Sequence, residues 1–316
     1  MSDVNTADQS EIIRNLEAAL AACKQTVTRK QARIDYFAGE VARLTSLLNE
    51  PDEDEQPTPT AVGSSAQPGN LDAFKALETE VGKLGAWRIF ISGTKPGPYD
   101  VERIKACLDG GRRPFVSVSG GVSTSAAATA AEEFVRLIKP LGGAGTITFG
   151  HEPTQKFSDP DGYVAAKNAY YRVIRAELSS WDCIDIFMLY DIVAGGPRHP
   201  DNWIAERGLL DGLGVDAYDQ GKKQPGAMLA PALALADKYQ LPLYVTETST
   251  VEKPDDPSYK PNWIKAMAEF CRNEPRIPTW IWFHSKVGPN APDYGWFVNT
   301  SDAATEAFKA AVAAQW

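Results

Sequence analysis

The segment TITFGHEP, residues 146–153, joins a short apolar run to a His-Glu-Pro cluster. β-branched and aromatic residues fill the run, and glycine and proline follow it, which is typical of a short buried strand. A second run of this kind, Leu243-Tyr244-Val245, leads to Glu247, which lies 95 residues after Glu152. Each of the two expected strands therefore ends in a glutamate.

Similar runs alternate with helical segments from residue 60 onward, and this alternation indicates parallel βα units. Eight such units in roughly 255 residues predict a (β/α)8 TIM barrel over residues 60–316. The other arrangement of these units is a doubly wound open sheet, but no glycine-rich nucleotide loop follows the first strand. The predicted strands are residues 60–64, 87–92, 114–119, 146–150, 184–190, 214–218, 243–247 and 279–284. The predicted helices are residues 70–83, 124–139, 160–178, 227–239, 262–272 and 303–314.

The first 50 residues carry a heptad pattern in place of βα units. From Ile13 to Leu48 every a and d position is apolar except Lys30. Five heptads without proline predict a coiled-coil helix over residues 1–50 that self-associates, in preference to a helix packed on its own domain. The mixed a and d residues leave dimer and trimer open. Residues 51–59, PDEDEQPTP, predict an extended acidic linker.

Composition narrows the classes of partner. The 316 residues are 43% hydrophobic and 10% aromatic, enough for a sizeable core. The net charge is −9, and residues 1–55 hold 11 acidic and 6 basic side chains, so the rest is mildly acidic. This charge argues against a nucleic-acid partner, because a phosphate backbone requires a basic surface. The sequence shows neither a run of 18 apolar residues that would predict a membrane span nor a signal peptide.

The four cysteines, Cys23, Cys107, Cys183 and Cys271, lie far apart in the sequence. They show neither zinc-ligand spacing nor a disulfide framework, which favours buried free thiols. We therefore expect no metal site built on them.

The two strand-end glutamates have a chemistry in common. In a (β/α)8 barrel, residues that follow the strands converge at the carboxyl-terminal mouth, so Glu152 and Glu247 are expected on one rim. Glycosidases use a pair of carboxyl groups, one to protonate the leaving oxygen and one to attack the anomeric carbon or to activate water. A single glutamate in such a loop more often caps a helix or forms an ion pair. The pair therefore predicts glycoside hydrolysis, a reaction that needs no metal or nucleotide cofactor.

Four motifs carry a resemblance to a known family. FGHEP (149–153), VDAYD (215–219), YVTET (244–248) and WIWFH (280–284) resemble the clan A glycoside hydrolases, most closely family 26, which includes β-mannanases. The resemblance extends over most of residues 60–300. The tryptophan-rich segment that usually follows the first motif is replaced by TQKFSDPDGY.

The resemblance implies roles for individual residues. It implies that Glu152 is the acid/base and Glu247 the nucleophile of a retaining hydrolase of β-linked polysaccharide. It also implies that Tyr218 contacts the nucleophile, that Trp282 forms a sugar platform and that His151 lines the same subsite.

Further polar and aromatic residues fall at predicted strand ends. Tyr190, Asp216 and His284 do so, and Trp296 follows the last strand. Aromatic faces stack on sugars and short polar groups bond their hydroxyls, so we expect these residues in substrate binding. Arg88 lies inside the second predicted strand and could point into the barrel or outward.

The architecture resembles bacteriophage tail proteins that engage a host envelope glycan. It combines a predicted coiled coil, no signal peptide and a glycosidase-like barrel. We therefore expect the protein to be located on a virion tail or to be exported by a route other than ordinary secretion. The cytoplasm is the alternative location. Two other functions fit the sequence: a barrel that binds glycan without turnover and a structural tail component.

Overall fold

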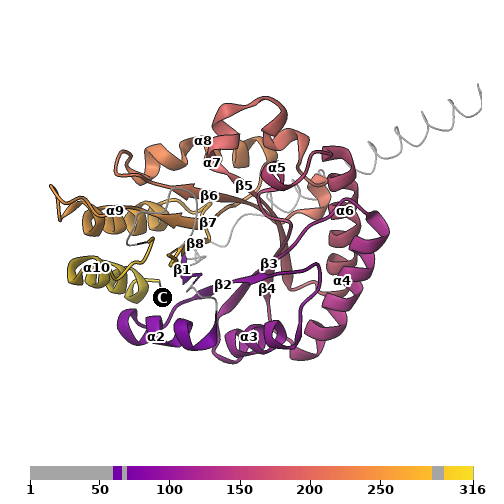
Figure 1. Cartoon of the computed structure of the whole chain (residues 1–316), viewed down its shortest axis with the longest axis horizontal. Coiled ribbons are helices and arrows are strands. Elements are labelled where there is room, and N and C mark those ends of the chain that lie inside the picture. Colours follow the sequence, from indigo (N-terminus) through magenta and orange to yellow (C-terminus); the bar gives the residue numbers. More distant parts are fainter. Residues whose placement is uncertain (1–59, 66–69, 287–294, 316) are drawn as a thin grey trace, which may run out of the picture. The chain divides into compact units, whose positions relative to one another are not determined.

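The computed structural model describes residues 60–65, 70–286 and 295–315. Within these residues eight parallel strands form a closed barrel in the order β1 to β8, and β8 pairs with β1. The predicted (β/α)8 barrel is confirmed, and Figure 1 shows helices surrounding the strands. The predicted coiled coil and linker lie outside the described residues. The strands are β1 Ala61–Ser64, β2 Ala86–Ile91, β3 Arg113–Val118, β4 Gly145–Phe149, β5 Trp181–Met188, β6 Gly212–Tyr218, β7 Leu243–Ser249 and β8 Thr279–Trp282.

The helices begin at local capping signals. The Asn70 side chain accepts from the Ala73 N–H at 2.7 Å at the start of α2, and Asp159 caps α6 in the same way. Of the nine described α-helices, α3, α5 and α7 were not predicted. The helices are α2 Leu71–Val81, α3 Pro98–Asp109, α4 Thr124–Ile138, α5 Pro153–Lys156, α6 Pro160–Glu177, α7 Leu189–Ala194, α8 Pro225–Tyr239, α9 Tyr259–Asn273 and α10 Asp302–Ala313. The short 3-10 turns are η1 Lys139–Leu141, η2 Gly196–Arg198, η3 Pro200–Asn202 and η4 Arg207–Leu209.

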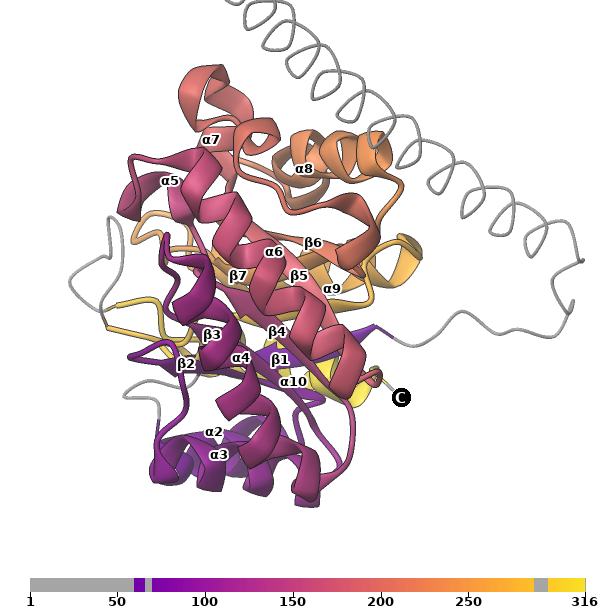
Figure 2. The ribbon, with the colours of Figure 1, turned by 90° about the vertical axis from the view of Figure 1, so that its right-hand side faces the viewer.

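Alternation along the strands builds two apolar layers. Outward side chains such as Trp87, Ile147 and Val215 belong to the layer between the strands and the helices. Helices α4 and α6, for example, pack side by side beyond β4 and β5 (Figures 1 and 2). The inward apolar side chains form a separate small cluster inside the barrel, consisting of Phe115, Ile184, Ile186, Tyr244 and Ile281.

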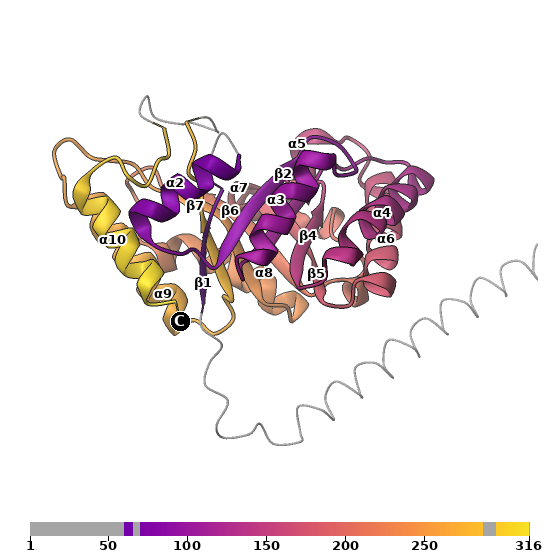
Figure 3. The same cartoon turned by 90° about the horizontal axis from the view of Figure 1, so that it is seen from below.

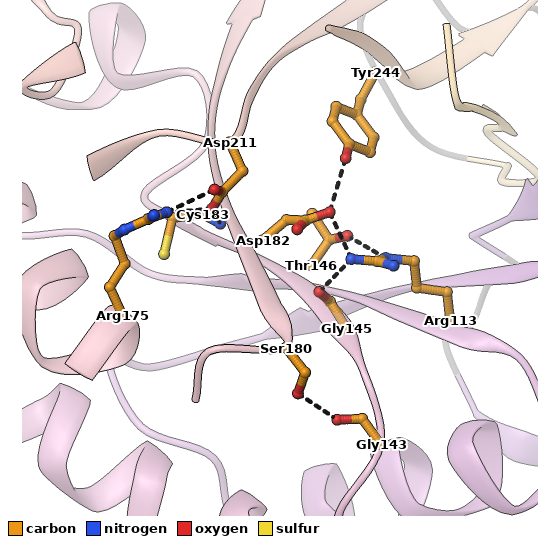
Figure 4. A network of polar contacts seen from close by, with 10 residues as sticks. All are labelled: Arg113, Gly143, Gly145, Thr146, Arg175, Ser180, Asp182, Cys183, Asp211 and Tyr244. Atoms are coloured by element: carbon orange, nitrogen blue, oxygen red, sulfur yellow. Dashed lines mark hydrogen bonds and ion pairs between the residues drawn. The ribbon is translucent and has the colours of Figure 1, made fainter. Parts of the chain in front are cut away.

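A polar layer closes the amino-terminal end of the barrel. Arg113 of β3 donates to Thr146 Oγ1 at 2.9 Å and to Asp182 of β5 at 2.5 Å, and the Tyr244 hydroxyl of β7 donates to the same carboxylate at 2.8 Å. Figure 4 shows these side chains converging from different strands. The Asp211 carboxylate accepts from Arg175 in the same view. This end of the barrel is therefore cross-linked by ion pairs and hydrogen bonds.

The carboxyl-terminal end of the barrel lies opposite this polar layer. Figure 3 shows the barrel from the side, with α5 at the end toward which the strands run.

Among the described residues, none of the helices has the length and apolar character needed to cross a bilayer. Cys107, Cys183 and Cys271 are buried free thiols, as expected.

Candidate active site

The turn after β4 positions Glu152 through its backbone. Gly150 and Glu152 both have positive φ, 66° and 53°, and a Cβ atom on Gly150 would lie 2.9 Å from the Gly120 backbone. The Tyr163 hydroxyl lies 2.6 Å from the Gly150 carbonyl oxygen. The Glu152 N–H donates to the Ile186 carbonyl of β5 at 3.1 Å. The surrounding structure thus holds Glu152 in a left-handed conformation at the start of α5.

A β-bulge in β7 aims Glu247. The register pairs Val245 and then Glu247 with successive residues of β6, so Thr246 is the extra residue. Thr246 donates to Asp216, and the Tyr218 hydroxyl donates to Glu247, so both β7 side chains face the barrel interior. In a strand without the bulge, consecutive side chains face opposite sides, and Glu247 would point toward the helices, as Val245 does. The bulge therefore turns Glu247 into the mouth.

Charged groups from several strands converge on Glu247, which is 5% exposed. Its Oε1 lies 3.6 Å from the Arg88 guanidinium of β2, and its Oε2 accepts from Tyr218. Burial raises the pKa of Glu247 to about 7, against the opposing charge of Arg88. The Glu152 carboxyl adds to this rise in pKa, and the hydrogen bond from Tyr218 opposes it. Glu152 is therefore close enough to Glu247 to influence its protonation.

Asp216 is the third acid at this site. Burial raises its pKa well above the ordinary value, and the charge of Glu247 raises it further. Burial also raises the pKa of Glu152, while Lys156 and Arg88 oppose the rise. The Glu152 and Asp216 carboxyl groups can hydrogen-bond when one of them carries a proton. The three acids thus retain protons in a range of pH where isolated carboxyl groups are ionised.

Arg88 points into the barrel mouth, which resolves the alternative that the sequence left open. It is 1% exposed, and its guanidinium carbon lies 5.0 Å and 5.2 Å from the ring centres of Phe90 and Phe115. None of its Nε, Nη1 and Nη2 atoms has a hydrogen-bond partner within the described part of the chain. Its nearest described anion is Glu247, at 3.6 Å.

Lys156 is a site residue that the sequence analysis missed. It ends α5, and its Nζ folds back to lie 3.0 Å from the His151 carbonyl oxygen and 3.1 Å from His151 Nε2. Burial and the positive charges of Arg88 and Lys156 hold the pKa of His151 well below its ordinary value, so this imidazole is neutral. Burial lowers the pKa of Lys156, and the charges of Glu152, Asp216 and Glu247 oppose this and favour its cationic form. The short α5 helix, which the sequence analysis did not identify, brings it there.

A pocket of about 350 Å³ adjoins the acids. Asp216 and Tyr218 form one wall, and Tyr190 forms part of another. Strand β5 ends two residues before Tyr190, so this residue lies in the first turn of α7 and is 43% exposed. A hollow of about 580 Å³ between α6 and residues 197–204 is larger but contains neither glutamate. The smaller pocket is therefore the one next to the candidate chemistry.

Two aromatic residues of β8 and its extension lie elsewhere than expected. Trp282 is fully buried between the barrel and the outer helices, with its ring 6.2 Å from Trp263 and 5.9 Å from Phe308. His284 is 8% exposed, and its Nδ1 accepts from the Val298 N–H at 3.2 Å. Both side chains face outward because of the strand's alternation, so the structure does not bring them to the mouth.

Phe283, which has the opposite orientation to Trp282, reaches the site in its place. Its ring lies 5.6 Å from the Tyr218 ring in an edge-to-face arrangement. Trp296 also contacts Tyr218, with ring centres 5.3 Å apart, but it is fully buried. Trp296 thus supports Tyr218 from behind and offers no exposed face to a sugar. Of the predicted residues, His151, Glu152, Tyr190, Asp216, Tyr218 and Glu247 are gathered at the mouth and its adjoining pocket.

Comparison with known proteins identifies the fold. No family model matches this sequence, and no curated protein matches it. Among solved structures, a glucosidase from Croceicoccus marinus has a TM-score of 0.59 at 13% identity, over 84% of this chain and 69% of that one. A GH128 endo-β-1,3-glucanase from Amycolatopsis mediterranei has a TM-score of 0.52 at 13% identity, over 80% of this chain and 99% of that one.

A third structure, a mutant of β-glucuronidase 2 from Bacteroides uniformis, has a TM-score of 0.53 at 13% identity. The alignment covers 77% of this chain but 32% of that one, so this chain spans about a third of that protein's length. All three proteins are glycoside hydrolases by name. At these identities the likeness shows a shared barrel fold.

Proposed function

We propose that this protein is a retaining glycoside hydrolase of a β-linked glycan, with Glu247 as nucleophile and Glu152 as acid/base. The observation that carries the proposal is the convergence of these two carboxyl groups at the carboxyl-terminal mouth of a closed barrel, where the charge of Glu152 raises the pKa of Glu247. The names of the structural neighbours, an endo-β-1,3-glucanase and a β-glucuronidase among them, support a β-linked substrate. The resemblance of FGHEP and YVTET to family 26 supports the assignment of the two roles.

The reaction divides into two steps. In the first, a Glu247 carboxylate oxygen attacks the anomeric carbon while Glu152 gives its proton to the departing glycosidic oxygen, and a covalent glycosyl ester forms. In the second, water attacks the anomeric carbon, Glu152 takes the water's proton, and the ester bond to Glu247 breaks. Two inversions give net retention at the anomeric carbon.

The electrostatics of the mouth fit this alternation. Attack requires the ionised form of Glu247, which predominates above pH 7 because burial raises the pKa of this group to about 7. Arg88 and the Tyr218 hydroxyl oppose that rise and so favour the ionised form. The ionised Glu247 in turn favours protonation of Glu152. Once Glu247 is esterified, its charge is gone, so the pKa of Glu152 falls and this group can serve as base. The exposed Tyr190 offers a stacking face for a sugar ring in the adjoining pocket.

Reducing-end release from a panel of β-linked polysaccharides tests the activity. Glu247→Ala and Glu152→Gln are each expected to lower turnover by at least about a thousandfold with an unchanged circular dichroism spectrum. Proton NMR of the first-formed product tests the stereochemistry, because retention gives the β anomer. Full activity in both variants would refute the site, and a first product with the α configuration would refute the nucleophile role.

We further propose that residues 13–48 associate as a coiled coil and present the barrel from a bacteriophage tail to a host envelope glycan. The support is the heptad pattern and the acidic linker in the sequence. Sedimentation equilibrium of the full chain should give two or three times the monomer mass. Leu20→Asp, at a heptad position, should give a monomer, whereas a monomeric wild-type chain would contradict the stalk.

A further inference from the structure

The barrel mouth holds more positive charge than the proposed reaction needs. Arg88 and Lys156 both act on the acids, and each influences the pKa of Glu152. Arg88 already lies next to Glu247, at 3.6 Å. Lys156 is not part of any ion pair with a described residue at salt-bridge distance; its described polar partners are two atoms of His151. This second cation has no evident role in orienting the nucleophile.

A charge count shows the imbalance in the reactive state. The proposed mechanism requires Glu247 ionised and Glu152 protonated. Asp216 holds its proton because of burial and the neighbouring charge of Glu247. His151 is neutral. The Asp191 carboxyl also acts on Glu152, but its charge is opposed by that of Arg198. Arg88 and Lys156 then face the single negative charge of Glu247, so the reactive mouth carries a net charge of +1.

Unpaired hydrogen-bond donors accompany this excess charge. Arg88 is 1% exposed, and its three guanidinium nitrogens lack hydrogen-bond partners within residues 60–65, 70–286 and 295–315. Because the ammonium of Lys156 can only donate, His151 Nε2 accepts from it, and the His151 proton therefore resides on Nδ1. This Nδ1 is buried and also lacks a described partner. Two buried acceptors near the acids, Asp191 Oδ1 and Asp216 Oδ2, also lack a described partner, but the four nitrogen atoms of Arg88 and His151 outnumber them. Buried donors are normally satisfied, so the group points to a ligand rich in acceptors.

We propose that the sugar unit bound beside Glu152 and Glu247 carries a carboxylate, and that Lys156 and Arg88 neutralise it. This inference rests on the proposed function and narrows its substrate to acidic glycans such as polyuronates. A neutral sugar would displace water from the two cations and leave one charge uncompensated in a drier site, which is costly. A carboxylate restores neutrality and accepts charge-assisted hydrogen bonds from the ammonium and the guanidinium.

Lys156 is the residue that should set this preference. Both cations lower the pKa of Glu247, but Arg88 does so more strongly than Lys156, so removal of Arg88 would impair both neutral and acidic substrates. Lys156 lies at the end of the four-residue helix α5, held by His151 and away from the strands that build the barrel. A substitution there changes the charge of the mouth without disturbing the core.

Matched oligosaccharides that differ in one group provide the test. The probes are cello-, laminari- and manno-oligosaccharides, each compared with its counterpart oxidised at C6 from CH2OH to carboxylate. Binding is measured by titration calorimetry to full-length Glu152→Gln, which mimics the protonated acid and blocks turnover. At least one oxidised probe should bind about tenfold or more tightly than its neutral partner, the size of one charge-assisted hydrogen bond. Added salt should reduce the difference.

Variants of Lys156 in this background identify the source of the preference. Lys156→Gln should reduce the preference to about twofold or less, and Lys156→Arg should retain it because the charge remains. Lys75→Gln, on the exposed face of α2, is the matched control and should leave the preference unchanged. Equal binding of both members of all three pairs, or a preference that survives Lys156→Gln, would overturn the proposal.

The result is separable from that for the proposed function. Hydrolysis of any neutral probe by the wild-type chain, and its loss in Glu247→Ala, would uphold the hydrolase assignment even where the acidic preference fails. Tight binding of an oxidised probe without its hydrolysis by the wild-type chain would uphold the carboxylate subsite and refute the hydrolase.

Discussion

Glu247→Gln should reveal the proton that the folded barrel retains on this side chain. In the folded chain the pKa of Glu247 is raised from 4.5 to about 7, chiefly by burial. The unfolded chain releases the proton near 4.5 and the folded chain near 7, so between these values unfolding releases a proton. Raising the pH across that window therefore favours the unfolded state. The glutamine variant has no such proton and escapes this loss.

The size of the effect follows from the shift. At about 1.4 kcal/mol for each pKa unit, the wild-type barrel should lose about 3 kcal/mol of unfolding free energy between pH 4 and pH 8.5 that the variant keeps. For a domain of this size, that corresponds to a change in melting temperature of about 6 °C. Because the unfolding free energies of both chains are compared at two pH values, any pH-independent difference in stability between glutamine and protonated glutamate cancels.

Urea unfolding followed by tryptophan fluorescence measures this difference. All eight tryptophans lie at or after residue 87, so the signal reports on the barrel alone. Glu102→Gln, on the exposed surface of α3, is the matched control for the chemical change. If the stability gain of Glu247→Gln is the same at both pH values, Glu247 does not retain its proton in the folded chain, and the electrostatic account of the site is refuted.

Three other substitutions test separate parts of the structure. Tyr218→Phe removes a donor that lowers the pKa of Glu247, so the acidic limb of the kcat/KM profile should move to higher pH; an unmoved limb would contradict the contact. Trp282→Phe should cost about 1–3 kcal/mol in urea unfolding, because a buried ring loses volume, while KM stays within about twofold. A raised KM with unchanged stability would return Trp282 to a sugar-binding role. Arg113→Ala should cost about 1–3 kcal/mol, since its ion pair with Asp182 is about a third exposed, and should leave kcat unchanged. A loss of kcat at full stability would show that the two ends of the barrel are coupled.

The barrel was predictable because its signal repeats along the chain. Each strand is a short β-rich run, and the strand order of a closed parallel barrel follows the sequence order. The strands that end in Glu152 and Glu247 could therefore be placed on one rim without any contact being known. The helices α5 and α7 were missed because four and six residues are too few to show helical periodicity.

Side-chain direction at the strand ends was harder to predict. Trp282 and Phe283 are neighbours in sequence, and only their orientation decides which of them faces the mouth. Simple alternation would have resolved this case. In β7, however, alternation from Val245 predicts that Glu247 points toward the helices, whereas it points into the barrel mouth. The prediction fails because the bulge at Thr246 has no signature in the sequence. Lys156 was missed for a related reason: its proximity to the acids depends on the fold of a four-residue helix.

The left-handed backbone at Glu152 has a consequence for protein engineering. A glutamate in this region costs about 1 kcal/mol or more relative to glycine or asparagine, which adopt it readily. A library at this position sorted for heat resistance would therefore enrich variants that cannot donate a proton. If the chain has the proposed activity, each round of selection for heat resistance must therefore also measure product formation.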